Sequence, residues 1–230
     1  MDILHFFKEF YDNGCLAKGI YSSFITLLPK NENPGGVSDY RPISLIGSLY
    51  KILSKVLASR LKKVLPKIIG ESQSAFIGGR NILDGILVSN EVVDWRKRKK
   101  KKGVILKLDF EKAYDTVNWE YLFNMMSSFG FQDKWIRWMK VCIQSVRVSV
   151  LVNGSPTNEF CPEKGLRQGD PLSPFLFNMV AEGLNILFQR AKALELIKGV
   201  VIGLREVNVT HLQFADDTIV FCEAEENDIL

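Results

Sequence analysis

The sequence predicts an α+β fold, and three observations lead to that class. The chain has 230 residues, 47% of them apolar and 24% charged, which is typical of a globular protein and argues against disorder. Segments with helical spacing and segments with strand-like alternation are mixed along the chain, without the regular βαβα order of a parallel sheet. No linker-like stretch separates them. We therefore expect one packed unit, with room for two subdomains.

The elements follow from the spacing of apolar residues and from the turn residues between them. In the amino-terminal half we expect a helix from Ile3 to near Gly14, a strand at Ser22–Leu28, a turn-rich loop at residues 31–39, a helix from Leu45 to Pro66, and a helix from Asn81 to a basic run. Further on we expect a strand at Val104–Phe110, helices at Trp119–Phe129 and Lys134–Gln144, a hairpin of Val146–Val152 with Thr157–Cys161, a long helix at Ser173–Lys192, and a hairpin of His211–Phe214 with Thr218–Phe221.

The positive net charge of +4 comes from one segment, because Arg96–Lys102 is seven consecutive basic residues. Without these residues, 23 of the 30 basic side chains remain against 26 acidic ones, a net charge of −3. The body of the protein therefore gives only weak support for nucleic-acid binding. Two interpretations of the run stay open: a solvated helix end and loop, or an accessory contact to phosphates.

Cysteine usage and hydropathy exclude several classes of protein. The cysteines Cys15, Cys142, Cys161 and Cys222 are scattered and form no Cys-x-x-Cys pair, so we expect core thiols in a reducing compartment rather than a zinc site or a disulfide framework. No apolar run reaches the roughly 18 residues of a membrane span, and the first residues lack the pattern of a secretory signal. We expect an intracellular protein without membrane association.

Carboxylates at predicted strand ends are the strongest sign of chemistry. Asp216 and Asp217 lie between two strand-like segments, and Asp109 ends another. An Asp-Asp turn that faces solvent is the simpler interpretation. If the strands are neighbours, however, the carboxylates repel each other, and a divalent cation would remove that repulsion. Magnesium suits such a small set of oxygen donors best. Adjacency of the strands does not follow from the sequence.

Five segments are specific enough to carry a family resemblance. They are Phe24–Lys30 with Asp39–Leu45, Gln73–Phe76 with Gly79–Asn81, Leu108–Asp115, Gly165–Pro174, and Phe214–Asp217. In this order they resemble two fingers motifs and the palm motifs A, B and C of reverse transcriptases from non-LTR (LINE-type) retrotransposons, especially the plant kind, with group II intron enzymes as more distant relatives. Phe214 stands where many reverse transcriptases have tyrosine, and it keeps the ring without the hydroxyl.

The resemblance implies a right-hand fold with fingers and an antiparallel palm sheet backed by helices. Residues 1–230 would form one reverse transcriptase domain, with about 1–103 mainly fingers and about 104–230 mainly palm. No thumb sequence follows motif C, so we expect a fragment truncated there, whose activity alone is doubtful.

The resemblance also assigns catalytic roles. Asp109 and Asp216 would bind two Mg²⁺ ions, with Mn²⁺ as a substitute, while Asp217 completes the cluster and the Phe110 carbonyl is a backbone ligand. Tyr114 would be a steric gate that excludes a ribose 2′-hydroxyl, with a half-buried core aromatic as the alternative.

Further residues would contact substrate. Lys30 and Arg41 match cations that bind the incoming triphosphate, although surface salt bridges would also explain them. Arg80 is either a substrate contact or part of an ion pair within the fingers. Gln168 and Gly169 match the turn that approaches the template–nucleotide pair, with a plain turn as the alternative. The neighbouring Asp170 receives no role.

The implied function is that of an RNA-directed DNA polymerase, which adds deoxynucleotides to a primer 3′-hydroxyl. Its partners would be an RNA template, a DNA primer and deoxynucleoside triphosphates, with no protein partner evident, and a nuclear location would fit the family. The alternative is a catalytically inactive retroelement relic with residual nucleic-acid binding. An RNA-dependent RNA polymerase is a third possibility, against which Tyr114 speaks because such enzymes must admit the 2′-hydroxyl.

Overall fold

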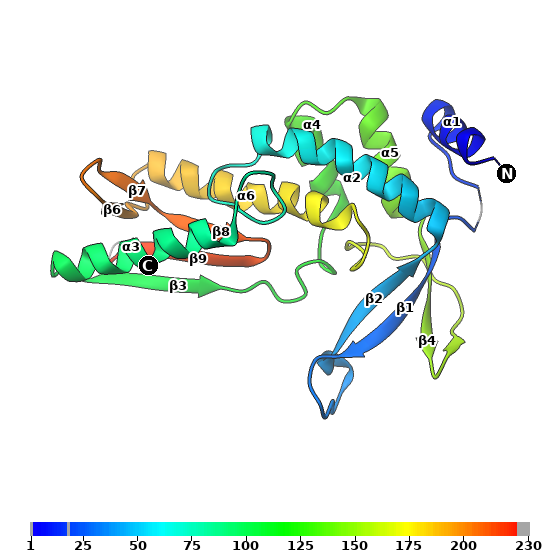
Figure 1. Ribbon diagram of the computed structural model, residues 1–230, viewed down its shortest axis with the longest axis horizontal. Helices are drawn as coiled ribbons and strands as arrows, with labels where there is room; N and C mark the ends of the chain where they lie inside the picture. The colour runs from blue at the N-terminus through cyan, green and yellow to red at the C-terminus, as the bar shows by residue number, and fades with distance from the viewer. Residues whose placement is uncertain (1, 18, 225–230) are drawn as a thin grey trace. The chain divides into compact units, whose positions relative to one another are not determined.

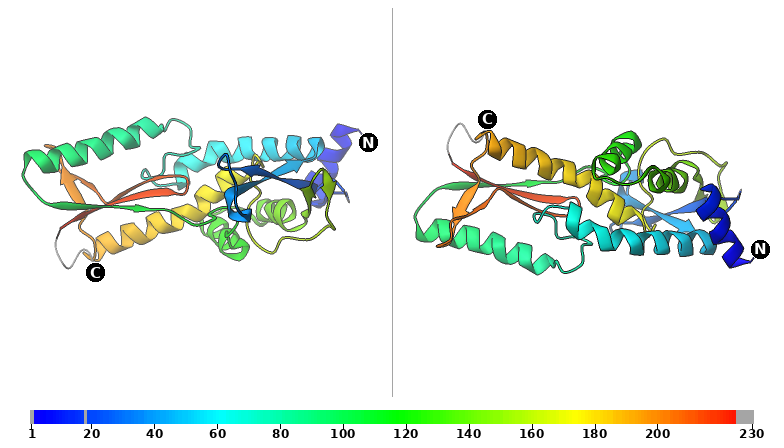
Figure 2. Two further views of the ribbon diagram at one scale, coloured as in Figure 1. Left: turned by 90° about the horizontal axis from the view of Figure 1, so that it is seen from below. Right: turned by 90° about the horizontal axis from the view of Figure 1, so that it is seen from above.

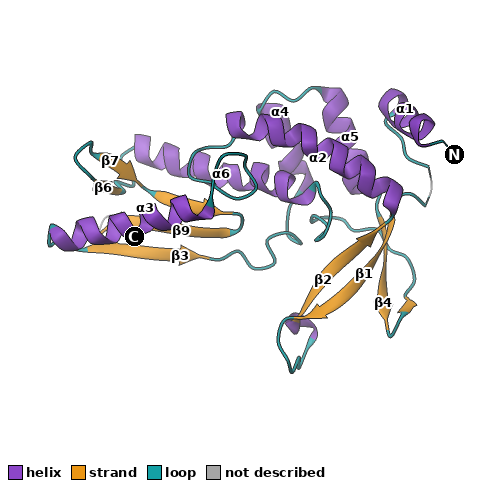
Figure 3. Cartoon of the chain, in the orientation of Figure 1, coloured by secondary structure: helices purple, strands orange, loops and turns teal. Residues whose placement is uncertain are grey.

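The computed structural model describes residues 2–17 and 19–224 (Figure 1). Helices and strands alternate irregularly along the chain, as the colours of Figure 3 show. The chain forms two compact units, each built from two separate segments. Unit 1 contains Met1–Leu61 and Tyr114–Phe177, and unit 2 contains Lys62–Ala113 and Asn178–Leu230. Two long helices, α2 (Ser48–Ile68) and α6 (Ser173–Ala193), are continuous and contribute residues to both units.

Unit 1 combines helices with a four-stranded sheet. Besides parts of α2 and α6, it contains α1 (Ile3–Asn13), β1 (Ser22–Pro29), the short 3₁₀ helix η1 (Val37–Asp39), β2 (Tyr40–Ile46), α4 (Trp119–Ser128), α5 (Asp133–Gln144), β4 (Arg147–Val152) and β5 (Ser155–Pro156). The strand order is β2-β1-β4-β5. β1 pairs antiparallel with β2 and parallel with β4. The sheet is visible in Figure 1 as the group of arrows labelled β1, β2 and β4.

The helices of unit 1 bury large apolar side chains. α1 begins at the N-cap Asp2 and ends at Gly14, whose left-handed backbone suits a helix end. Phe10 of α1 packs against Trp138 of α5, with ring centroids 5.5 Å apart. The core also contains buried side chains from α2, α4 and the start of α6: Tyr50, Leu53, Leu57, Leu122, Met126 and Leu176.

Unit 2 contains a three-stranded antiparallel sheet in the order β3-β9-β8. Its elements are α3 (Ile82–Arg98), β3 (Gly103–Leu108), β6 (Val200–Ile202), β7 (Val207–Val209), β8 (His211–Phe214) and β9 (Asp217–Glu223), with the remaining parts of α2 and α6. In both views of Figure 2, β3 and β9 run between α3 and the carboxyl-terminal part of α6. The core of this region consists of Val92, Val200, Ile202, Val209 and Phe221.

Most predicted elements are present with shifted ends, two predictions need correction, and some elements were not expected. α2 does not stop at Pro66 but continues to Ile68, because Leu65 and Ile69 are buried and the Ile69 N–H donates to the Leu65 carbonyl at 2.9 Å. The hairpin partner of β4 is β5 rather than the predicted strand at Thr157–Cys161, of which only Phe160 forms a bridge, to Val148. β2 and the β6–β7 hairpin were not expected.

The predicted α+β class is confirmed by this mixture of helices and mainly antiparallel sheets. Two of the four cysteines, Cys142 and Cys222, are buried as expected, whereas Cys15 and Cys161 are exposed. None of the helices in the described ranges combines the length and the apolar character that a bilayer-spanning helix needs.

Candidate active site

The pairing of β3 with β9 brings the predicted catalytic carboxylates to one end of the unit 2 sheet. Leu108, the last residue of β3, lies opposite Thr218 of β9. Asp109 follows Leu108 and Asp217 precedes Thr218, so antiparallel pairing places these two residues beside each other. Asp216 lies next to Asp217 in the turn between β8 and β9. The strand adjacency, which the sequence left open, is therefore shown by the register.

The turn that carries Asp216 is held by a buried glutamine. Ala215 adopts a left-handed backbone conformation with φ of 55°. Gln73 accepts the Ala215 N–H at 2.9 Å and donates its own amide to the Ala215 carbonyl at 3.2 Å. Its side chain is fully buried and also accepts the Ala75 N–H at 3.0 Å. Gln73 thus stabilises a backbone conformation that an alanine adopts only at an energetic cost. Gln73 lies in the second predicted fingers motif, and no function of its own followed from the sequence.

A lysine compensates part of the negative charge at this end of the sheet. The Lys107 ammonium lies 3.0 Å from an Asp217 carboxylate oxygen, and both side chains are exposed. The hydrogen bond and charge of Asp217, with a smaller contribution from Asp109, raise the pKa of Lys107. Both carboxylates therefore act electrostatically on the same ammonium group.

The donor chemistry of this site fits a divalent cation. Exposed carboxylates at a strand end are hard oxygen donors with room for water, as Mg²⁺ prefers. A cation, the Lys107 ammonium, already lies on one of them. The described residues contain no assembled group of three or more His, Cys, Asp or Glu side chains that could hold a metal ion. We infer that Asp217 would have to exchange Lys107 for the metal.

The two other unit 2 residues with predicted roles differ in their surroundings. Phe110 is exposed beside Asp109. Arg80 is held by backbone: its guanidinium donates to the carbonyls of Ile69 at 2.9 Å and Gln73 at 2.7 Å, and also to that of Gly70. These contacts stabilise the turn before α3. They are not the ion pair within the fingers that was one alternative, and the substrate contact stays a prediction.

In unit 1, the predicted gate and the motif B turn lie together. The Leu166 N–H donates to the Tyr114 carbonyl at 2.7 Å. The Gln168 amide donates to Asp115 at 3.3 Å. Tyr114 itself is half-buried and stacks on Phe177, with ring centroids 4.8 Å apart. This stacking would hold the ring in one orientation.

Gly169 is required by a close backbone approach to β2. Its φ is 101°, and a Cβ atom at this position would lie 3.1 Å from the Ser44 carbonyl oxygen. The Ser44 N–H also donates to the Gln168 carbonyl at 2.8 Å. The turn is therefore fastened directly to the strand that carries Arg41, which is exposed on β2.

Lys30 lies at the end of β1, where its ammonium donates to the Ser38 carbonyl at 2.7 Å. Neither Lys30 nor Arg41 takes part in an ion pair with another residue of the described ranges. The alternative of surface salt bridges therefore has no support within those ranges.

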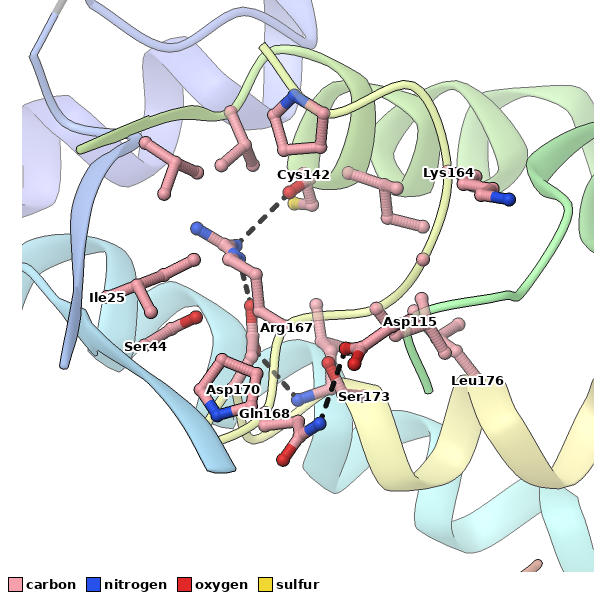
Figure 4. A pocket seen from close by; sticks show the side chains of 18 of the residues that line it. Ile25, Ser44, Asp115, Cys142, Lys164, Arg167, Gln168, Asp170, Ser173 and Leu176 are labelled. Atoms are coloured by element: carbon pink, nitrogen blue, oxygen red, sulfur yellow. Dashed lines mark hydrogen bonds and ion pairs between the residues drawn. The ribbon is translucent and has the colours of Figure 1, made fainter. Parts of the chain in front are cut away.

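Asp170, to which the sequence assigned nothing, is the centre of a buried polar network (Figure 4). Its carboxylate accepts hydrogen bonds from the Tyr50 hydroxyl at 2.9 Å and from the Ser54 hydroxyl. It also forms an ion pair of 2.6 Å with Arg167. Burial, followed by the influence of Cys142 and Asp170, raises the pKa of Tyr50 well above its usual value, so the hydroxyl stays a donor. The spacing of Arg167 and Asp170, opposite charges three residues apart just before the apolar helix α6, was the signal that could have revealed this pair.

The network borders a hollow of about 180 Å³ in unit 1. Figure 4 shows Arg167 within it, between Asp170 and the Cys142 carbonyl, to which the guanidinium donates at 3.3 Å. Apolar residues such as Ile25 and Leu176 complete the lining. Because Asp170 neutralises Arg167, the network explains the position of the Gln168–Gly169 turn better than it explains a ligand site.

The α+β arrangement of this chain matches the fold of solved telomerase structures. Its fold is similar to that of telomerase from Candida albicans in complex with a TWJ fragment of telomeric RNA. The TM-score is 0.62 over 91% of this chain and 39% of that chain, at 13% sequence identity.

The family model of reverse transcriptase (RNA-dependent DNA polymerase) matches residues 28–230, and the chain belongs to this family. Two similar relatives are transposon proteins. A Transposon TX1 protein of 149 kDa from Xenopus laevis is 29% identical over 94% of this chain. The Pol polyprotein of the R2 element from Popillia japonica is 30% identical over 89%. The chain spans 16% and 27% of these relatives. The resemblance to non-LTR elements is therefore confirmed, and the plant kind stays a prediction.

Proposed function

We propose that this chain carries the catalytic part of an RNA-directed DNA polymerase. One observation supports the proposal above all: the register of β3 with β9 gathers Asp109, Asp216 and Asp217 at one end of the unit 2 sheet. In a chain of the reverse transcriptase family, such a carboxylate group suits two-metal phosphoryl transfer. By function, about 1–103 would be mainly fingers and about 104–230 mainly palm.

The carboxylates would be the ligands of the catalytic metal ions. Asp109 and Asp216 would hold two Mg²⁺ ions, with Mn²⁺ as a substitute, and Asp217 and the Phe110 carbonyl would complete the ligands. When bound, the ions would lower the pKa of the primer 3′-hydroxyl and stabilise charge on the leaving pyrophosphate. Gln73 would keep Asp216 in place through the Ala215 backbone.

The unit 1 residues would position and select the nucleotide. Tyr114, held by its stacking on Phe177, would exclude a ribose 2′-hydroxyl. Gln168 and Gly169 would present the turn fastened to Ser44 to the template–nucleotide pair. Lys30 and Arg41, and Arg80 from unit 2, would contact the triphosphate or the template. The substrates would be an RNA template, a DNA primer and deoxynucleoside triphosphates.

Primer extension on an RNA template tests the proposal with the 230-residue chain and Asp216→Asn. The wild-type chain, whose unaided activity is expected to be small, should add a few deoxynucleotides to a labelled DNA primer when Mg²⁺ is supplied. Asp216→Asn should reduce extension by at least 10²-fold. The variant would lose a charged ligand of the metal ions that stabilise the transition state. Equal addition of deoxynucleotides by the wild-type chain and the variant would contradict the proposal.

Manganese binding, followed by electron paramagnetic resonance, separates a ligand role from a structural one. Asp216→Asn should weaken Mn²⁺ binding. Lys107→Met should strengthen it roughly three- to tenfold, since the competing ammonium is gone from Asp217. Lys62→Met removes the same charge from an exposed site on α2 and serves as the control. Equal affinity in all variants would mean that these carboxylates bind no metal.

A further inference from the structure

The seven-residue basic run is not a uniform solvated surface, because its first residue is buried and bound at both sides. Arg96 is only 9% exposed. Its guanidinium forms an ion pair of 2.7 Å with Glu223 of β9 and also donates to the carbonyl of Lys102, the last residue of the run. Arg96 therefore ties both ends of the run to the sheet of unit 2.

The backbone between these ends is hydrogen-bonded and has a defined shape. The Lys100 N–H donates to the Lys97 carbonyl and the Lys101 N–H to the Arg96 carbonyl, each at 3.1 Å. This is the hydrogen-bond pattern of a Schellman helix end. Lys100 has φ of 50°, in the left-handed region where such a helix end usually has glycine. The chain thus carries a cation where glycine would be more stable.

The result is a hollow of about 230 Å³ with a basic rim and an apolar floor. Arg96, Lys97, Lys100 and Lys101 line it, together with apolar residues of α3, β3, β6 and β9. Phe221 is a buried part of the floor, whereas Ile105 is 52% exposed. The Nε–H of Arg96 is buried and has no acceptor among the described residues.

The charge of this hollow is not neutralised within the described residues. Glu223 is already occupied by Arg96. Lys97, Lys100 and Lys101 form no ion pair there, and their mutual repulsion would be relieved by an anion. A ligand that carries several negative charges together with apolar surface suits both the rim and the floor. Single-stranded nucleic acid has this chemistry, because its phosphates alternate with bases and sugars.

This hollow is separate from the carboxylate site. It lies at the Gly103 end of β3, and the carboxylates lie at the Leu108 end. β3 is six residues long, so at about 3.3 Å per residue its first and last residues are ~17 Å apart. A strand in the hollow would therefore be bound several nucleotides away from the reacting atoms.

We propose that the hollow lined by Lys97, Lys100 and Lys101 binds the phosphate backbone of single-stranded RNA. The proposal rests on the polymerase function proposed above, for which it adds a template contact. It gives the basic run one of the two roles that the sequence left open, with Arg96 as the structural anchor and the lysines as the contacts.

The salt dependence of RNA binding tests the proposal. The full chain is titrated with a fluorescently labelled 20-nucleotide RNA at several salt concentrations, without nucleotides. Lys97→Gln/Lys100→Gln/Lys101→Gln should flatten the log–log salt slope by about 2, because three phosphate contacts at roughly 0.7 each are lost. Lys62→Gln/Lys63→Gln/Lys67→Gln changes the net charge equally at exposed positions of α2 and should leave the slope nearly unchanged.

An equal flattening in both triple variants, or none in the first, would overturn the proposal. The proposal would also be overturned if the first triple variant kept its affinity for RNA and lost affinity only for a polyglutamate peptide. That result would indicate an acidic protein partner. RNA binding needs no catalytic turnover. An unchanged salt slope would therefore contradict only the RNA-binding proposal, and the polymerase proposal would still be tested by Asp216→Asn.

The substitution Lys100→Gly should change RNA affinity and thermal stability in opposite directions, and it therefore separates the two roles of Lys100. Glycine relieves the left-handed strain, so the thermal unfolding midpoint should rise. RNA affinity should nevertheless fall about fivefold at 0.1 M salt, as expected for one lost phosphate contact. A more stable variant that binds RNA as well as the wild type would show that Lys100 makes no contact.

Discussion

At the scale of single residues, burial distinguishes the acidic side chains of this protein more sharply than their sequence motifs do. Asp109 and Asp217 are exposed at a strand end, where a carboxylate can exchange partners. Asp170 is only 5% exposed, and its carboxylate already has four partners. They are the Tyr50 and Ser54 hydroxyls, the Arg167 guanidinium, and the backbone N–H of Leu172 at 3.0 Å. The first kind of carboxylate is suited to chemistry, and the second to holding a turn in place.

Asp170→Asn should therefore be strongly destabilising. The substitution removes the negative charge beside the buried Arg167 guanidinium and leaves it unpaired. We expect a loss of about 3 kcal/mol in the free energy of unfolding, measured by urea denaturation. Asp94→Asn, at an exposed position of α3, is the control and should change it by less than about 0.5 kcal/mol. Equal stability of the two variants would mean that Asp170 carries no buried charge interaction.

At the scale of elements, the β8–β9 hairpin depends on a residue that is distant in sequence. Gln73 forms three hydrogen bonds to the backbone of Ala75 and Ala215. The Gln213 N–H also donates to the Ser72 carbonyl at 2.7 Å. The position of Asp216 is therefore set by the segment before α3 as well as by the hairpin itself.

Gln73→Leu should loosen this hairpin while leaving the apolar core intact. The buried N–H and carbonyl of Ala215 would lose their partners, at about 1–3 kcal/mol for each buried group left unsatisfied. Hydrogen exchange should show faster exchange at Ala215 and its neighbours, and primer extension should fall. Gln189→Leu, on the exposed side of α6, serves as the control. Unchanged protection of Ala215 would contradict the clamp.

The predicted elements were reliable where apolar spacing is long and regular, as in α2, α5 and α6. Ends were less reliable, because the burial of Leu65 and Ile69 extends α2 past Pro66. β2 was missed because Pro42 and alternating polar residues weaken its strand pattern. β6 and β7 are three residues each and have their stability from the core around Phe221, which only the tertiary structure brings together.

At the scale of the whole molecule, the candidate metal-binding carboxylates could be proposed from the sequence. The residues that hold the neighbouring turns and charges in place could not. The carboxylates were predicted as metal ligands because charge at strand ends needs compensation, and this role stays a prediction. The structural roles of Gln73, Asp170 and Lys107 were not predicted. Each of these side chains contacts a residue that is distant in the sequence: Ala215, Tyr50 and Asp217, respectively. The backbone contacts of Arg80, to three carbonyls before α3, were not expected either, and its contact with substrate stays a prediction.

The stability of the molecule should depend on pH through His211. This histidine is 2% exposed, stacks on Phe188, and lies 3.0 Å through Nδ1 from the Thr210 hydroxyl. Burial lowers the pKa of His211 to about 4 in the folded state, from an ordinary value of 6.5. Between these values the unfolded chain binds a proton that the folded chain does not, so stability is complete above pH 6.5 and is lost as pH falls toward 4.

We expect this loss to be no more than about 2 kcal/mol, after allowance for partial solvent screening. Glu182 acts in the opposite direction, because burial raises the pKa of its carboxyl and favours the folded state as pH falls. The difference between wild type and His211→Asn removes this background. Urea denaturation from pH 7.5 to pH 4.5 should show a steeper loss of stability for the wild type than for the variant. Parallel curves would mean that His211 is protonated equally in the folded and unfolded chains, and that its buried surroundings do not disfavour the charged ring.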